Sequence, residues 1–203
     1  MGETPTIRWA ELLPGADLMS AAELMALPQD RWRYELVSGR RLRMPPTELR
    51  HELIAHDLLY VLKRFVTAAG LGSVSLPQTG FVLNRPDQPD TVLVPALAFM
   101  RAERMTPTQA ATSSIDYLLR LVPDLVVEVA ASGQHRPALA EKTALWLGAG
   151  VRSVWVVWPA RRQVDCWHLG PDGQEGRTLN ADERLDDEDI VPGFSYLVAH
   201  LFM

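Results

Sequence analysis

The chain has 203 residues, of which 47% are hydrophobic and 22% charged, and its formal net charge is −5. These values are typical of a globular domain with a sizeable core, and they exclude a generally basic, phosphate-binding surface. Any contact with nucleic acid must therefore come from a local patch. A single cysteine, Cys166, excludes an internal disulfide framework, and no run approaches the roughly 18 apolar residues of a membrane helix. We expect a cytoplasmic protein with no membrane partner.

The first 30 residues predict an arm with a short helix, followed by a main domain over 31–203. In SAAELMALPQD (20–30), Ser20 and Glu23 have the spacing of a capping box, which favours a helix start. The run WRYELVSGRRLRM (32–44) alternates apolar and polar residues on both sides of Ser-Gly. This pattern predicts a β-hairpin.

A long helix is predicted over 47–69, ended by Gly70. Its apolar residues recur at helical spacing and should face the core: Leu53, Ile54, Leu58, Val61, Leu62 and Phe65. The segments that follow, up to residue 100, are short, apolar and separated by Gly, Pro, Asn and Asp, which predicts antiparallel strands. Residues 101–121 are polar and predict a crossing loop with a helical turn and no strand.

The stretch 123–159 predicts a strand, a helix and a second strand that together carry an acid and a base. The strand 125–129 contains Glu128, the helix 137–149 has Lys142 near its start, and the second strand covers 153–157. An unpaired charge inside such an apolar strand would be strongly destabilising, so Glu128 must be paired, bound to a metal or placed at a strand end. Without a chemical role, Lys142 or Arg136 would neutralise it as a buried ion pair.

The C-terminal part predicts further strands over 163–169 and 177–179, with Cys166 as an ordinary strand residue. The acidic run DERLDDED (182–189) is most simply a solvated loop, with metal binding as the weaker alternative. Residues 190–202 should return to the core. The tryptophans of this half are expected in the core or in the interface of a homodimer: Trp146, Trp155, Trp158 and Trp167.

Most catalytic signatures are missing from the sequence. It has no Gly-x-Ser-x-Gly elbow, no glycine-rich phosphate loop and no paired Cys-x-x-Cys, and its histidines are scattered. The remaining candidate chemistry is a set of acids with a lysine. Carboxylates can hold a hard cation such as Mg²⁺, and a lysine can stabilise charge or orient the attacking water.

Several parts of the chain form a set with a characteristic order and spacing: YELVSG (34–39), MPP (44–46), His51, VLVPALAFMRAER (92–104), PDLVVEV (123–129) and EKTALWLGAGVRSVWVVWP (141–159). This set resembles a large bacterial family of endonuclease-like proteins in the PD-(D/E)xK, or restriction-endonuclease-like, superfamily. The resemblance implies an α/β fold with a mixed central β-sheet, flanking helices over 47–69 and 137–149, and added N-terminal and C-terminal strands. It also implies a Mg²⁺-dependent DNA endonuclease.

The resemblance also assigns roles by position. Glu128 would be a metal ligand and Glu35 a further acid near the metal. Lys142 would be the base that stabilises charge or orients water, moved from the strand to the following helix. His51 would line the site. Each of the last three also has a plainer interpretation, because Glu35 can face solvent, Lys142 can be an exposed helix residue and His51 can cap or pack the helix.

Three positions depart from the family pattern. Val94-Pro95-Ala96 stands where the family has Val-Pro-Asp, so a methyl group replaces the principal metal-binding carboxylate. Arg40 and Trp158 also stand where the family usually has acids. Asp87 and Asp90 lie upstream, and at about 3.3 Å per strand residue Asp90 would be about 20 Å from position 96. Two hypotheses stay open: a Mg²⁺-dependent DNA endonuclease impaired by Ala96, and a catalytically inactive relative that binds DNA or another protein.

Overall fold

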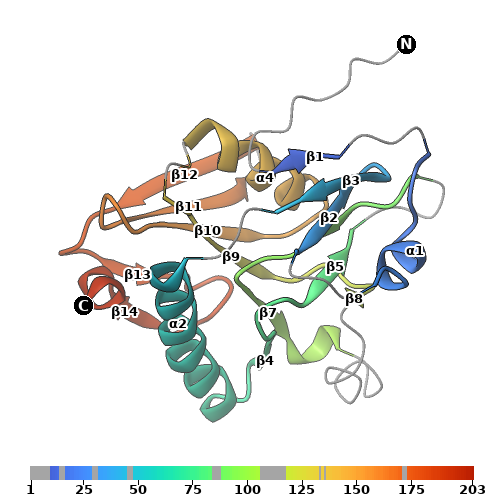
Figure 1. The fold of residues 1–203 in the computed structure, drawn as a ribbon. Helices are drawn as coiled ribbons and strands as arrows, with labels where there is room; N and C mark the ends of the chain where they lie inside the picture. Colours follow the sequence, from blue (N-terminus) through green and yellow to red (C-terminus); the bar gives the residue numbers. More distant parts are fainter. Residues whose placement is uncertain are drawn as a thin grey trace.

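The computed structural model describes residues 10–13, 17–28, 32–44, 48–83, 88–105, 118–132, 134, 136–170 and 173–203. Within these ranges, strands make up two six-stranded sheets and a two-stranded sheet, with helices packed around them (Figure 1). The expected mixed α/β fold is confirmed, but its strands are divided between two large sheets. The expected division of the chain at residue 30 stays a prediction.

The central sheet has the strand order β12-β11-β10-β9-β7-β4. Its strands are β4 (Gly72–Val74), β7 (Leu97–Arg101), β9 (Leu125–Val129), β10 (Ser153–Trp158), β11 (Gln163–Gly170) and β12 (Gly173–Leu179). Only the pair β9–β10 is parallel among the described strands of this sheet, and helix α4 (Arg136–Gly148) connects the two. Parallel neighbours need such a crossover. The predicted strand–helix–strand unit is therefore confirmed.

The N-terminal sheet has the order β1-β3-β2-β6-β5-β8. Its strands are β1 (Glu11–Leu12), β2 (Tyr34–Val37), β3 (Arg40–Arg43), β5 (Gly80–Val82), β6 (Val92–Leu93) and β8 (Leu118–Leu119). The hairpin β2–β3 is confirmed, and its turn residues Ser38 and Gly39 have φ of 49° and 75°, as tight hairpin turns require. Strand β8 pairs in parallel with β5, so the expectation of no strand over 101–121 was wrong.

The helical turn expected in the same segment is present as the 3-10 helix η1 (Ala102–Arg104). Residues 106–117 lie outside the described part of the chain. At the N-terminal side, the short helix α1 (Ala21–Met25) begins with the predicted capping box between Ser20 and Glu23.

Helix α2 (Leu49–Ala68) confirms the long helix, and Gly70 follows its end with φ of 66°. The side chains buried along it are Ile54, Ala55, Leu58, Leu62 and Val66. Leu53, placed in this stripe from the sequence, is 56% exposed. Each residue turns an α-helix by about 100°, so Leu53 lies about 140° from the centre of the stripe formed by Ile54, Leu58 and Leu62.

The central sheet separates two hydrophobic cores. On one face it packs against α2 and the C-terminal segment, which contains β13 (Arg184–Asp186), β14 (Ser195–Leu197) and the 3-10 helix η2 (Val198–Phe202). On the other face it packs against α4 and the N-terminal sheet. Strand β13 lies inside the acidic run that was expected to be a loop, because Leu185 is fully buried and anchors it.

Buried aromatic residues and the cysteine fill these cores. Trp146, Trp155 and Trp158 are at most 5% exposed. Cys166 is buried in β11, where burial raises the pKa of its thiol to about 12. It is the ordinary strand residue that the sequence predicts. No helix within the described ranges is long and apolar enough to cross a membrane.

Candidate active site

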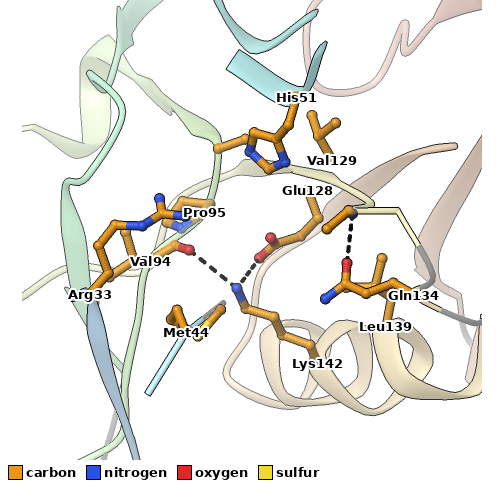
Figure 2. A pocket seen from close by; sticks show the side chains of 12 residues that line it. Arg33, Met44, His51, Val94, Pro95, Glu128, Val129, Gln134, Leu139 and Lys142 are labelled. Atoms are coloured by element: carbon orange, nitrogen blue, oxygen red, sulfur yellow. Dashed lines mark hydrogen bonds and ion pairs between the residues drawn. The ribbon is translucent and has the colours of Figure 1, made fainter. Parts of the chain in front are cut away.

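Lys142 lies at the centre of the candidate site (Figure 2). Its Nζ is 2.9 Å from Glu35 Oε1 and 2.9 Å from Glu128 Oε1. The same ammonium donates a hydrogen bond of 3.2 Å to the backbone oxygen of Val94. Lys142 is in the middle of α4, not near its start, and is 1% exposed, so the interpretation as an exposed helix residue is wrong.

Glu35 comes from β2 of the N-terminal sheet and is fully buried. Besides Lys142, its Oε1 accepts a hydrogen bond of 2.8 Å from the backbone N–H of Val94. The alternative of a solvent-facing acid is therefore wrong. Glu35 lies in β2 and Val94 directly follows β6, both in the N-terminal sheet, whereas Glu128 lies in the central sheet. Lys142 therefore joins the two sheets by polar contacts.

Glu128 is the buried acid of β9, 6% exposed. Its Oε1 accepts a hydrogen bond of 2.9 Å from Trp146 Nε1. Trp146 follows Lys142 by four residues, which puts both on the same side of α4. This partner was missed from the sequence, although its spacing from Lys142 was a usable signal. Arg136, the other candidate counter-ion, pairs with Asp165 instead.

The pKa values in this cluster are governed by burial and by the opposite charges. Burial raises the pKa of Glu128 above its usual range, and the attraction of Lys142 reverses only part of that rise. For Lys142, burial alone would lower the pKa of the ammonium, but the charges of Glu128 and Glu35 outweigh it and raise that pKa. Lys142 is therefore a permanent cation between two acids at neutral pH.

His51 approaches the cluster from the N-terminal end of α2. This end is fixed to the loop after β9, because the Glu48 carboxylate accepts hydrogen bonds from the Ser132 backbone N–H (3.1 Å) and hydroxyl (2.7 Å). Burial, followed by the charge of Arg33, lowers the pKa of His51. Its Nδ1 is buried and has no hydrogen-bond partner among the described residues. His51 is thus a neutral imidazole with an available nitrogen.

These groups line a pocket of about 40 Å³, which is enough for a few water molecules. Its lining includes Glu128, Lys142, His51, Arg33 and Ala96, and Figure 2 shows the side chains of the first four. The backbone N–H of Ala96 donates to Val127 O at 3.0 Å, so residue 96 adjoins the strand that carries Glu128. An aspartate at this position would face the same pocket.

The side chains present do not fit a Mg²⁺ centre. This ion requires several converging oxygen ligands, but Ala96 offers none and the nearest carboxylate oxygens already bind Lys142, Trp146 and Val94 N–H. Within the described part of the chain, no three His, Cys, Asp or Glu side chains are grouped as possible metal ligands. The cluster is electrostatically complete with an ammonium as its cation.

Two other acids near these positions of the chain serve the fold. Asp90 accepts a hydrogen bond from Ala21 N at the start of α1, so it holds the N-terminal helix and does not replace position 96. Asp124, 1% exposed, pairs with Arg104 at 2.8 Å and accepts the backbone N–H of Arg101. Asp87 lies outside the described residues.

The chain is similar to known proteins both in sequence and in fold. A family model described as "Uma2: Putative restriction endonuclease" matches residues 21–199. The fold is similar to a solved structure from Anabaena variabilis ATCC 29413, described as a putative nuclease belonging to DUF820, with a TM-score of 0.74 and 17% sequence identity. The alignment covers 91% of this chain and 97% of that one. None of the curated proteins matches the chain.

Proposed function

Because the chain belongs to the Uma2 family, described as putative restriction endonucleases, we propose that it is a nuclease-fold DNA-binding protein without effective Mg²⁺-dependent cleavage. The observation that carries this proposal is the buried ammonium of Lys142 between Glu35 and Glu128, next to the methyl group of Ala96. A lysine already pairs with the two acids that the family pattern would give to a metal.

A divalent metal ion and Lys142 would compete for the same carboxylate oxygens. A divalent ion would have to displace Lys142 or share Glu128 with it, and Ala96 provides no carboxylate in return. Electrostatic stabilisation of the developing charge is usually the largest catalytic contribution, so loss of a principal metal ligand should reduce hydrolysis by several orders of magnitude.

A local basic segment supports the DNA-binding part of the proposal in an otherwise acidic protein. The hairpin region 32–44 contains four arginines, Arg33, Arg40, Arg41 and Arg43, and its single acid is the buried Glu35. Arg43 also lies 4.4 Å from the ring of Trp32. Arg33 and Met44, at the open end of this hairpin, line the pocket. Such a patch can contact phosphates beside the site.

A second candidate is an impaired but active Mg²⁺-dependent DNA endonuclease. The specific observation in its favour is that Glu128, Lys142 and the neutral His51 still line one pocket. His51 could accept a proton from a water molecule there, and Lys142 could stabilise negative charge. Homodimer formation stays a prediction under both candidates.

Plasmid nicking and metal-binding calorimetry distinguish the two candidates. We expect the natural protein to show neither Mg²⁺ nor Mn²⁺ binding and no nicking above background. Ala96→Asp should create metal binding and nicking, and Glu128→Ala in that background should remove both. Nicking by the natural sequence that disappears in Glu128→Ala would instead establish the impaired endonuclease.

Binding to duplex DNA is tested separately by fluorescence anisotropy over a range of salt concentrations with chelator present. The double variant Arg40→Ala/Arg41→Ala should weaken binding and reduce the slope of log affinity against log salt by about 1 for each arginine that contacts a phosphate. The exposed α2 pair Lys63→Ala/Arg64→Ala is the matched control. Absence of binding by the natural protein would refute the DNA-binding proposal.

A further inference from the structure

A second and larger pocket lies on the other side of α4, above strands β10, β11 and β12. It has a volume of about 380 Å³, within the range of roughly 300–1,000 Å³ found for small-molecule sites. The strand register explains its floor. Val156 pairs with Asp165 and Val154 with Trp167, so residues of β10 and β11 share the face that α4 covers. Opposite these, Thr178 and Gly176 continue the same face onto β12.

Two residues that line this pocket carry buried polar atoms without a partner among the described residues. Thr143 of α4 is 2% exposed, and its Oγ1 is buried without a hydrogen-bond partner among the described residues. The same holds for Arg136 Nε, about two helical turns earlier on α4. A buried polar atom without a partner is destabilising. Two of them in one pocket indicate that something else completes them.

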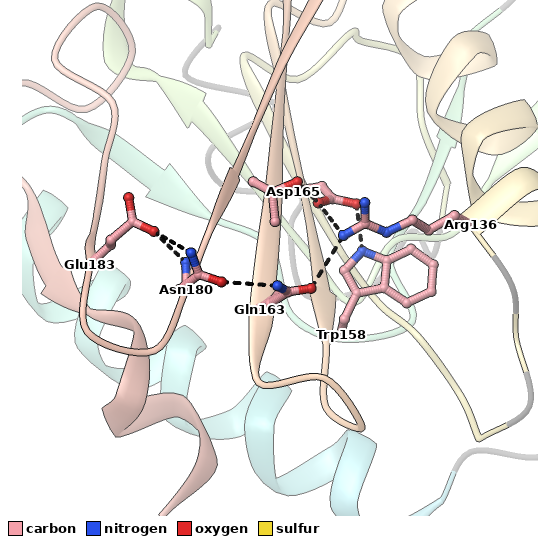
Figure 3. A network of polar contacts seen from close by, with 7 residues as sticks. Arg136, Trp158, Gln163, Asp165, Asn180 and Glu183 are labelled. Atoms are coloured by element: carbon pink, nitrogen blue, oxygen red, sulfur yellow. Dashed lines mark hydrogen bonds and ion pairs between the residues drawn. The ribbon is translucent and has the colours of Figure 1, made fainter.

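The charge of the pocket is already balanced (Figure 3). Arg136 Nη2 lies 3.0 Å from Asp165 Oδ1, which also accepts the Thr178 hydroxyl at 2.6 Å. Asp165 Oδ2 accepts Trp158 Nε1 at 2.8 Å. Both carboxylate oxygens are therefore used within the protein. Arg177, which also lines the pocket, is paired with Asp186. Each charged side chain of the lining therefore has a partner of opposite charge within the protein, which suits a neutral ligand with hydrogen-bond acceptors better than a phosphate.

The apolar surface of the pocket is aromatic and accessible. The ring of Trp167 lies against Gly176 on the neighbouring strand, where an added Cβ would come within 2.5 Å of its Cε3 atom. Only a glycine permits the indole to lie flat across β12 in this way. Trp167 is half-buried, so part of its ring is open to a ligand. Trp158 and Val156 extend this apolar lining.

We propose that this pocket binds a nucleobase, whose flat ring would stack on Trp167 and whose acceptor atoms would pair with Thr143 Oγ1 and Arg136 Nε. A flat, neutral, acceptor-bearing ring matches the shape, the charge and the unpartnered donors together. The inference goes beyond the proposed function, because none of Glu35, Glu128 and Lys142 lines the pocket. The base can come from a free nucleoside or from an unpaired nucleotide in a single strand.

Isothermal calorimetry with chelator present tests the proposal with three probes: each common deoxynucleoside, a short single-stranded oligonucleotide and its duplex. The natural protein should bind a nucleoside or the single strand. Thr143→Val should weaken that binding by about fivefold, and Trp167→Ala by about tenfold. Thr143→Ser, which keeps the hydroxyl, should restore most of the affinity, and Thr67→Val at an exposed position of α2 should change nothing.

Every outcome is decisive once thermal unfolding shows that the variants fold. Nucleoside binding alone identifies free nucleosides as the source, whereas tighter binding of the single strand identifies nucleic acid, and both support the proposal. No binding of nucleoside or single strand, or binding that Thr143→Val and Trp167→Ala leave unchanged, overturns it. Duplex binding through the hairpin arginines should not change in Thr143→Val and Trp167→Ala. If these variants weakened binding of duplex and single strand equally, the proposal would be overturned, because a paired base cannot enter the pocket. Failure of nicking has no bearing on these results.

Discussion

The two polar clusters on the two sides of α4 are built from the same parts. In each, a carboxylate of the central sheet accepts a tryptophan Nε1–H and pairs with a cation of α4. The sets are Glu128, Trp146 and Lys142 on one side, and Asp165, Trp158 and Arg136 on the other.

The two clusters differ in their exposure to solvent, in the number of acids that face the cation and in the size of the adjoining pocket. The Lys142 side chain is 2% exposed and faces a second acid, Glu35, whereas the Arg136 side chain is 41% exposed and has one acid partner. The first cluster leaves about 40 Å³ of space and the second about 380 Å³. The same chemical unit therefore closes a core at one position and borders a ligand-sized pocket at the other.

Replacing Lys142, the buried cation, should have the largest effect on stability and test the difference between the two clusters most directly. Lys142→Met leaves two buried carboxylates without a counter-ion, and we expect the free energy of unfolding to fall by about 3–5 kcal/mol. Urea denaturation measures this, with the exposed Lys63→Met on α2 as control. A loss below about 1 kcal/mol would show that the cluster does not hold the sheets together. Adding Glu35→Gln and Glu128→Gln to Lys142→Met should recover much of the loss.

Removing the acid of the more open cluster should have a smaller effect. Asp165→Asn keeps the shape but weakens the charge-assisted contacts to Arg136 and Trp158, and we expect a loss of about 2 kcal/mol in unfolding free energy. Asp182→Asn at an exposed position is the matched control. If Asp165→Asn destabilised the protein as much as Lys142→Met, the proposed difference between the clusters would be wrong.

The pH dependence of stability should distinguish the Glu128 cluster further. Because burial raises the pKa of Glu128, the folded protein keeps this proton above pH 4.5, the ordinary pKa, where the unfolded chain has released it. The unfolding free energy should therefore fall as pH rises from 4.5 to the folded pKa, by at most about 1.4 kcal/mol per pH unit for one proton. Glu128→Gln should lack this component when unfolding is measured across pH at constant ionic strength. Parallel curves for the two proteins would contradict the raised pKa.

An exposed ion pair should contribute least to the unfolding free energy among the pairs considered. Arg177 and Asp186 pair at the surface with side chains 51% and 45% exposed. Arg177→Ala should change the unfolding free energy by no more than about 0.5 kcal/mol, because solvent and salt screen the pair. A loss comparable with that of Asp165→Asn would mean that exposure is a poor guide to the strength of these pairs.

The elements and acids of the central unit were predictable because they depend on local patterns. An apolar strand interrupted by Glu128, followed by a helix with Lys142, requires a counter-ion nearby whatever the rest of the chain does. The pattern also misled at one position. Leu53 is apolar and precedes Ile54 in the sequence, yet it is 56% exposed, because its angular position on the helix turns it away from the buried stripe.

The partners that complete the site were not predictable in the same way. Val94 contributes a backbone oxygen, which any residue could supply, so the sequence carries no signal for it. The division of strands between two sheets decides that Glu35 meets Lys142, and it depends on pairings distant in the chain, such as β5 with β8. Asp165 was missed because an acid in an alternating strand usually faces solvent, whereas here α4 covers it.

Lys142 links two β-sheets. It contacts Glu35 and Val94 at the N-terminal sheet and Glu128 in the central sheet. These contacts stabilise the packing of the two sheets whether or not a reaction occurs at the site. They give Glu35, Glu128 and Lys142 a structural value that does not depend on hydrolysis. If Ala96→Asp creates cleavage as proposed, sequences of this type have to be compared at position 96 as well as at these three residues.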